Sequence, residues 1–162
     1  MKRLNIALVA HDARKGELVD WAKFNAQVLG NHNLYATGTT AKLLSNLKVI
    51  KRAHYEGDFF LDQQVPLEVT ALLSGPLGGD QQIGAMIAEG KIDMLIFFCD
   101  NLITQGHQQD VGALSRLASL YNIAFATNRT TADMLLTSTL LYDEYYCPQI
   151  PKAIETYTNR KL

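Results

Sequence analysis

Met94-Leu95-Ile96-Phe97-Phe98 is an unbroken run of apolar residues, and it is the strongest indication of the fold class in this chain. A strand with one face in water alternates apolar and polar side chains, whereas a strand covered on both faces is apolar throughout. The run therefore predicts a strand at residues 93–98, covered on both faces in a parallel sheet. Other short apolar runs, rich in β-branched or aromatic residues, predict further strands at 5–10, 33–36, 69–73 and 123–126.

Segments with helical periodicity separate these runs. Leu18, Trp21 and Ala22 mark the apolar face of one predicted helix. Two more apolar faces are marked by Ile83, Met86 and Ile87 and by Val111, Leu114, Leu117, Ala118 and Tyr121. The alternation of strands and helices favours an open, doubly wound α/β sheet with right-handed crossovers. In that architecture a ligand binds beyond the carboxyl ends of the strands.

The composition is that of one ordinary globular domain spanning residues 1–162. The chain is 48% hydrophobic and 19% charged, and a domain of its 162 residues can bury about two thirds of its unfolded surface. Its 15 basic and 16 acidic residues leave a formal charge of -1, so no basic surplus is present to neutralise a nucleic-acid backbone. We therefore expect no nucleic-acid partner.

The sequence also argues against a membrane or secreted protein. No apolar stretch approaches the roughly 20 residues that a membrane-spanning helix needs. The N-terminal residues reach His11 and Asp12 before any small-residue cleavage site, which favours a first strand over a signal peptide. Cys99 and Cys147 are too few for a disulfide framework and too far apart for a CxxC metal motif. We expect a soluble protein in a reducing cytoplasm.

Two segments fall outside the alternating pattern. Residues 48–66 are polar and irregular, and they predict a surface excursion between two α/β units, with a short extra hairpin as the alternative. Residues 148–162 predict a short extended piece and then a helix entered at Pro151, because proline is accepted at the first helical position.

A hydroxyl-rich turn follows the second predicted strand. Thr37-Gly38-Thr39-Thr40 leads directly into a helical pattern, so it offers free backbone N–H groups and the positive end of a helix dipole. These features are typical of a phosphate site. Threonine is also a routine helix N-cap, which is the structural alternative. The first predicted strand ends at His11 and Asp12, with Lys15 one helical turn further on.

A glycine-rich turn follows the third predicted strand. Residues 74–82, Ser-Gly-Pro-Leu-Gly-Gly-Asp-Gln-Gln, allow close approach of the backbone to a ligand and place Asp80 where a helix begins. Asp80 is a candidate base, although a plain N-cap would use the same residue. The turn has neither the lysine of a P-loop nor a GxGxxG pattern, so a ligand smaller than a nucleotide cofactor is favoured.

Polar residues also follow the fourth predicted strand. Asp100 comes just after it, and the loop beyond brings His107 and Asp110 before the next helix. Since all of these turns lie beyond carboxyl ends of strands in one sheet, we expect their side chains to converge. Histidines and carboxylates also suit a zinc or iron site, but no HxxxH pair is present. A phosphate cradle beside a carboxylate and a histidine favours proton abstraction next to a carbonyl, without a metal.

Four strings in this chain resemble the methylglyoxal synthase family. They are Val-Ala-His-Asp at 9–12, Leu-Tyr-Ala-Thr-Gly-Thr-Thr at 34–40, Leu-Ser-Gly-Pro-Leu-Gly-Gly-Asp-Gln-Gln at 73–82 and Glu-Gly-Lys-Ile-Asp-Met-Leu-Ile-Phe-Phe at 89–98. The match continues through 110–118 and 122–128. The resemblance implies a three-layer α/β/α sandwich with a mostly parallel, doubly wound five-stranded sheet. It also implies a cytoplasmic homohexamer that converts dihydroxyacetone phosphate to methylglyoxal and inorganic phosphate, a glycolytic bypass, with no metal or organic cofactor.

The resemblance also assigns roles to individual residues. Asp80 would be the catalytic acid/base and His107 the group that polarises the substrate oxygens, with Asp12 and Asp110 as further acidic groups of the catalytic site. His11 would lie in the substrate pocket, and Arg160 would match a C-terminal arginine that contacts phosphate. The phosphate itself would be held by Lys15, Thr37, Gly38, Thr39, Thr40, Ser74 and Gly75.

The chain departs from the family pattern in two places. Cys99, Asn101, Gly106 and Gln108 stand where the family usually has an aromatic residue, two prolines and an acidic residue, which predicts a more flexible loop around His107. Residues 48–66 are expected to be an insertion. Two other functions fit the same motifs. One is a regulatory ligand-binding domain like that of large carbamoyl phosphate synthetases, and the other is a related phospho-sugar lyase or isomerase.

Overall fold

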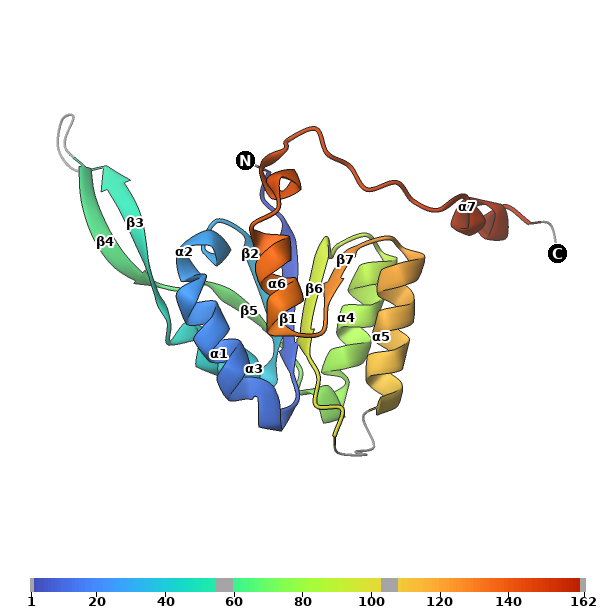
Figure 1. Cartoon of the computed structure of the whole chain (residues 1–162), viewed down its shortest axis with the longest axis horizontal. Helices are drawn as coiled ribbons and strands as arrows, with labels where there is room; N and C mark the ends of the chain where they lie inside the picture. The colour runs from blue at the N-terminus through green and yellow to red at the C-terminus, as the bar shows by residue number, and fades with distance from the viewer. Residues whose placement is uncertain (1, 55–59, 103–107, 161–162) are drawn as a thin grey trace.

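The apolar runs of the sequence form one parallel sheet at the centre of the molecule (Figure 1). The computed structural model describes residues 2–54, 60–102 and 108–160. Every neighbouring pair in the sheet is parallel, which confirms the predicted five-stranded parallel sheet. Its strands, in the order β5-β2-β1-β6-β7, are β5 (Val69–Leu72), β2 (Asn33–Thr37), β1 (Asn5–Ala10), β6 (Met94–Phe98) and β7 (Ala124–Ala126).

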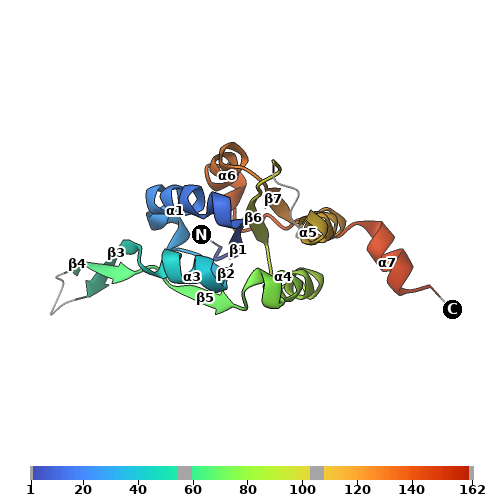
Figure 2. The same ribbon diagram turned by 90° about the horizontal axis from the view of Figure 1, so that it is seen from below.

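Helices cover both faces of the sheet and make three layers (Figure 2). Side chains alternate along β1, so Ile6 and Leu8 pack against one helical layer while Ala7 and Val9 pack against the other. The first layer contains α1 (Lys15–Phe24), α2 (Ala26–Leu29), α3 (Gly38–Ser45) and α6 (Arg129–Leu136). The second contains α4 (Gly79–Ala88) and α5 (Gln108–Leu120). Every residue of β6 is buried, as its continuous apolarity predicts.

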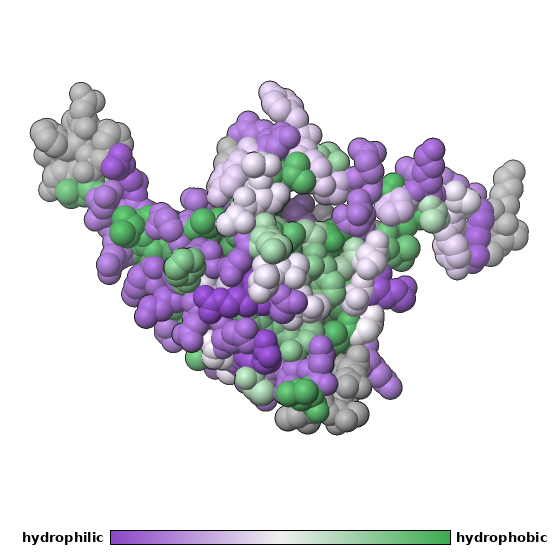
Figure 3. Space-filling model, in the orientation of Figure 1, coloured by the Kyte–Doolittle hydropathy of each residue, from purple (hydrophilic) through white to green (hydrophobic). Residues whose placement is uncertain are grey.

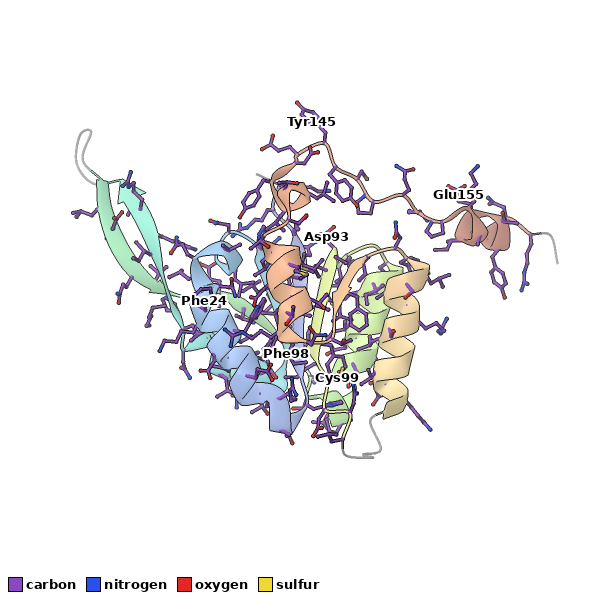
Figure 4. The ribbon with its side chains drawn as sticks, viewed as in Figure 1. Phe24, Asp93, Phe98, Cys99, Tyr145 and Glu155 are labelled. Atoms are coloured by element: carbon purple, nitrogen blue, oxygen red, sulfur yellow. The ribbon has the colours of Figure 1, made fainter. Side chains whose placement is uncertain are left out.

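The order of the strands reverses between β1 and β6. From β1 the chain moves outward to β2 and β5, and it then returns across the sheet to β6 and β7. The turns after β1 and β6 therefore diverge to opposite faces and leave a crevice at the carboxyl ends. Figure 4 shows that Phe98 and Cys99 lie at this edge and that Asp93 lies at the opposite, amino edge.

Residues 48–54 and 60–66 form an antiparallel ribbon of β3 (Lys48–His54) and β4 (Phe60–Pro66), so the hairpin alternative is the one that the chain adopts. The ribbon projects from the sheet (Figure 1). The side-chain amide of Gln27 fastens its base, donating to Ile50 O at 2.9 Å and accepting from Ile50 N at 3.2 Å. Val49 is buried there against the first helical layer.

The C-terminal segment runs away from the sheet after the short 3-10 helix Thr139–Tyr142 (Figures 1 and 2). As predicted, an extended piece precedes a helix, α7 (Lys152–Thr158), with Pro151 as its N-cap and no buried residue in it. Apolar side chains are exposed along the ribbon and along this segment (Figure 3), among them Ile50 and Ile150. In the part of the chain that the structure describes, no helix has the length and apolarity needed to span a bilayer.

Candidate active site

A cavity of about 250 Å³ lies at the carboxyl ends of β1, β2 and β5. It brings together eight of the residues proposed from the sequence, namely His11, Asp12, Lys15, Thr37, Thr39, Ser74, Gly75 and Asp80. Apolar walls come from Val9, Ala10, Pro76 and Phe97, which the sequence did not single out because nothing local distinguishes them from core residues. The carboxylate of Asp80 and the turn at 37–40 therefore face one shared space.

The phosphate-type turn is built by the direct passage from β2 into α3. Thr37 is the N-cap of α3 in an extended conformation, and its side chain makes no capping hydrogen bond within the described chain. A Cβ on Gly38 would lie 3.1 Å from Ser74 Cα and 3.2 Å from Ser74 N, so the lack of a side chain at Gly38 lets this turn approach the backbone of the Ser74 turn closely. Gly38 N donates to Leu73 O at 3.3 Å, which joins the two turns. Thr40 is buried in the first turn of α3 and does not line the cavity.

Asp80 lies in the first turn of α4 and is 7% exposed. Two glycines make this position reachable. Gly78 takes the left-handed conformation, with φ of 103°, where the chain turns into α4. A Cβ on Gly79 would lie 2.0 Å from Leu73 O, so that residue must be glycine for α4 to pack against the end of β5. The positive end of the α4 dipole favours the ionised carboxylate.

The carboxylate of Asp80 reaches back over the Ser74 turn. A Cβ on Gly75 would lie 3.1 Å from Asp80 Oδ2, so the absence of a side chain at Gly75 leaves the acid open toward the cavity. The site therefore has the turn at 37–40 and a buried carboxylate on either side of Ser74 and Gly75.

His11 is held in a single protonation form by the chain after β6. Its Nδ1 accepts a 2.8 Å hydrogen bond from the backbone N–H of Asp100, so the proton of the neutral ring is on Nε2. The ring packs edge-on against Phe97, with centroids 5.1 Å apart. Nε2 is buried and bonds to no group in the described residues. A histidine in this tautomer can donate a hydrogen bond from Nε2 to a ligand oxygen.

Lys15 and Asp12 lie together at the mouth of the cavity. Lys15 Nζ is 2.5 Å from Asp12 Oδ1, and the Asp12 side chain is 93% exposed. The Lys15 side chain is the less exposed partner, at 21%, and it is the only lysine or arginine among the described residues that line the cavity. The pair can exchange partners when an anion enters, because an exposed ion pair is worth little.

Asp110 lies on the other side of Asp80. A second cavity, of about 350 Å³, lies between α4 and α5 and is lined by both acids together with Gln81, Gly84, Ala85, Ala113, Leu114 and Leu117. Gln81 Nε2 donates to Asp110 Oδ1 at 3.2 Å. His107 lies outside the described residues. Arg160 is not brought to either cavity, because its guanidinium stacks on the Tyr157 ring at 3.8 Å in the C-terminal segment.

Cys99 is buried just after β6, in the second hydrophobic cluster. Burial raises the pKa of its thiol to about 11, and the nearby Arg14 lowers it by less. Its Sγ donates to Phe97 O at 3.3 Å. The thiol therefore stays neutral and acts as a packing group. Among residues 2–54, 60–102 and 108–160, no group of three or more His, Cys, Asp or Glu side chains is arranged to hold a metal.

A doubly wound parallel sheet, with a glycine-lined carboxylate facing a threonine-rich helix N-terminus across one cavity, defines a class of three-layer α/β domain. The MGS-like domain model matches residues 17–127 of this chain. Methylglyoxal synthase of Proteus mirabilis (strain HI4320) is 52% identical over 140 residues, which is 86% of this chain and 81% of the relative. Methylglyoxal synthase of Maridesulfovibrio salexigens is 47% identical over 158 residues, covering 98% of this chain and 97% of the relative.

Solved structures lead to the same family. The crystal structure of methylglyoxal synthase from Elizabethkingia anophelis NUHP1 superposes with a TM-score of 0.79 at 41% identity, covering 99% of this chain and 93% of that one. The chain belongs to the methylglyoxal synthase family, as its motifs implied.

Proposed function

We propose that this chain eliminates phosphate from dihydroxyacetone phosphate to give methylglyoxal and inorganic phosphate. The observation that supports this most directly is the shared cavity of Asp80 and the turn at 37–40. A three-carbon phosphate ester fits between a buried base and an anion-binding turn that lie so close together. Family membership at about half identity supports the same activity.

Asp80 begins the reaction as the base. It takes a proton from the hydroxymethyl carbon, and the electron pair of that C–H bond forms the double bond of an enediolate. Negative charge develops on the former carbonyl oxygen, and donors aimed at that oxygen stabilise it. His11 Nε2–H is one such donor on geometric grounds. His107 is assigned to the same oxygens by its position in the family motif.

Phosphate leaves in the second step. The hydroxyl on the deprotonated carbon gives its proton to the departing phosphate and becomes the aldehyde, while the double bond shifts and the C–O bond to phosphate breaks. The enolate that remains takes the proton held by Asp80 on its terminal carbon and becomes methylglyoxal, which returns Asp80 to its ionised form. The leaving bond must stand roughly perpendicular to the enediolate plane, and Lys15, Thr39 and Ser74 around the phosphate would hold that angle. Every step uses side chains and backbone alone, so the proposal includes no metal or organic cofactor.

The proposal extends to the assembly and its place in the cell. Tyr145 is 95% exposed and points away from the body of the molecule (Figure 4), and Ile150 and Tyr157 are 60% and 64% exposed. Apolar groups so exposed on one segment are typical of a subunit interface, so we propose a homo-oligomer, with the hexamer of the family as the expected form. A phosphate contact by Arg160 would then be made in another copy, because α7 lies away from its own cavity (Figure 1). We place this glycolytic bypass in the cytoplasm.

The decisive experiment is a product assay. The purified chain is incubated with dihydroxyacetone phosphate, and methylglyoxal and inorganic phosphate are measured separately. Equal amounts of both products are expected. Formation of glyceraldehyde 3-phosphate instead would identify an isomerase, and turnover of a pentose phosphate in a substrate panel would identify a related lyase.

A regulatory ligand-binding domain is the second candidate. It would use the same anion-binding turn, but it has no use for a buried carboxylate beside the ligand. Asp80 in the shared cavity therefore favours the enzyme. Binding of phosphate esters with no turnover of any of them would support the regulatory domain.

A further inference from the structure

Two consecutive glutamines follow Asp80 and reach to opposite sides of it. Gln82 Oε1 accepts a 2.8 Å hydrogen bond from the backbone N–H of Leu73, at the end of β5. Gln81 Nε2 donates to Asp110 Oδ1 at 3.2 Å, in the first turn of α5. The start of α4 is thus tied to two different parts of the site.

Leu73 connects Gln82 to the anion-binding turn. The carbonyl of Leu73 accepts the N–H of Gly38 at 3.3 Å, and Gly79 packs directly against the same carbonyl. The N–H of Leu73 is held by Gln82 and its C=O is held by Gly38, so the backbone of this one residue links α4 to the turn at 37–40. The location of the turn therefore depends on the Gln82 amide.

Gln81 makes the corresponding link on the other side. α5 begins at Gln108, so Asp110 lies in its first turn, shortly after the position of His107 in the sequence. The hydrogen bond from Gln81 holds this turn against α4, beside Asp80. Neither glutamine lines the cavity that contains the turn at 37–40, and both are exposed, so neither is placed to touch a ligand in that cavity.

We propose that Gln82 and Gln81 are positioning residues: Gln82 holds the turn at 37–40 in place for the phosphate of the substrate, and Gln81 holds the first turn of α5 beside Asp80. The proposal rests on the function proposed above. The two links predict different kinetic effects. Loss of the Gln82 link weakens phosphate binding in both the ground state and the transition state, which raises KM, whereas loss of the Gln81 link misplaces catalytic groups and lowers kcat.

The test compares variants that remove or keep each hydrogen bond. Gln82→Leu should raise KM about 10-fold with kcat within about threefold of wild type, and it should weaken inorganic phosphate binding by calorimetry to the same degree. Gln82→Glu keeps the acceptor and should restore both values, and Gln82→Asn, with its acceptor one methylene short, should behave as Gln82→Leu does. Gln81→Leu should lower kcat about 10-fold with KM unchanged.

Gln27 provides the matched control. Its side-chain amide also hydrogen-bonds to the backbone of one residue, since it donates to Ile50 O and accepts from Ile50 N at the base of the ribbon. Gln27 does not line either cavity that contains Asp80. Gln27→Leu should leave KM, kcat and phosphate affinity at wild-type values. Three outcomes would overturn the positioning roles. KM and phosphate affinity could be unchanged in Gln82→Leu, or Gln82→Glu could fail to restore them. Gln27→Leu could also change the kinetics as much as Gln82→Leu does. Absence of methylglyoxal from the wild-type enzyme would overturn the proposed function alone, since the phosphate titration of Gln82→Leu still reports on the link.

Discussion

The backbone N–H of Asp100 donates to Nδ1 of His11, at 2.8 Å, across the point where the strand order reverses. A backbone amide can only donate, so Nδ1 must keep its lone pair and the ring proton must be on Nε2. The turn after β6 therefore decides what the histidine after β1 can offer to a ligand, which is one hydrogen-bond donor. A residue type alone does not carry that information.

The donor on His11 can be tested by exchanging it for amides. In His11→Asn the side-chain oxygen can still accept from Asp100, but no donor reaches the place of Nε2, so kcat/KM should fall about 100-fold. In His11→Gln the terminal amide nitrogen can take the place of Nε2, and the loss should be smaller. Steady-state kinetics with dihydroxyacetone phosphate measure both. Equal losses in the two variants would contradict the assignment of the proton to Nε2.

Asp80→Asn should lower kcat by about 1000-fold or more, because an amide cannot take the proton from carbon. The fold should be unchanged, since asparagine has nearly the shape of aspartate. Methylglyoxal formation and circular dichroism are the two measurements. Full activity in this variant would eliminate Asp80 as the base.

Gly79→Ala should destabilise the protein by at least about 2 kcal/mol, because its Cβ would meet the carbonyl of Leu73, a backbone group that cannot rotate away. Gly16 in α1 is the matched control, since a Cβ there meets nothing within 4 Å. Gly16→Ala should stabilise by about 0.5–1 kcal/mol. Urea denaturation gives both values, and similar effects of the two substitutions would show that the contact of α4 with β5 is not as tight as described.

Stability should fall on the acid side because of His32. Burial lowers the pKa of this imidazole, Arg3 lowers it further, and Asp93 partly opposes them, while Nδ1 accepts from Leu4 N at 3.2 Å. The folded state therefore prefers the neutral ring. At pH well above 6.5, the ordinary pKa, both states are neutral and nothing is lost. As pH falls from 6.5 toward the lower folded pKa, the unfolded state takes up the proton first and stability decreases.

The control for this pH effect is His32→Asn, which keeps an acceptor for Leu4 N–H and does not titrate. Urea denaturation between about pH 5 and 7.5 should show a shallower dependence on pH in the variant than in wild type. Identical slopes would mean that other groups account for the acid sensitivity.

Ile150→Asp tests the proposed assembly. In an isolated chain this residue is exposed, and the substitution should change stability by no more than about 0.5 kcal/mol. In an oligomer that covers the C-terminal segment it would bury a charge, so light scattering should show a smaller particle than wild type. A wild-type protein that is already monomeric would contradict the proposal directly.

The sequence by itself determined the sheet and many of the residues that line the cavity at its carboxyl edge. The strands predicted at 5–10 and 93–98 differ from β1 and β6 by at most one residue, because an apolar run bounded by polar turn residues is a local signal. The turns at 37–40 and 74–80 were also visible, because the carboxyl ends of parallel strands must share one edge. For residues 48–66 the sequence favoured an irregular surface excursion and offered a hairpin only as the alternative, since polar ribbons carry little periodicity.

Only the tertiary structure decided which hydrogen-bond and stacking partners those residues have. The partner of His11 is a backbone N–H. The link from Gln82 to the turn at 37–40 runs through the backbone N–H and C=O of Leu73. Arg160 stacks on Tyr157, away from the cavity. Every residue except proline has the same backbone N–H and C=O, so the residue type does not indicate which backbone groups will hydrogen-bond to a side chain. Their roles follow from the packing that brings distant strands together, and that packing exists only in the folded chain.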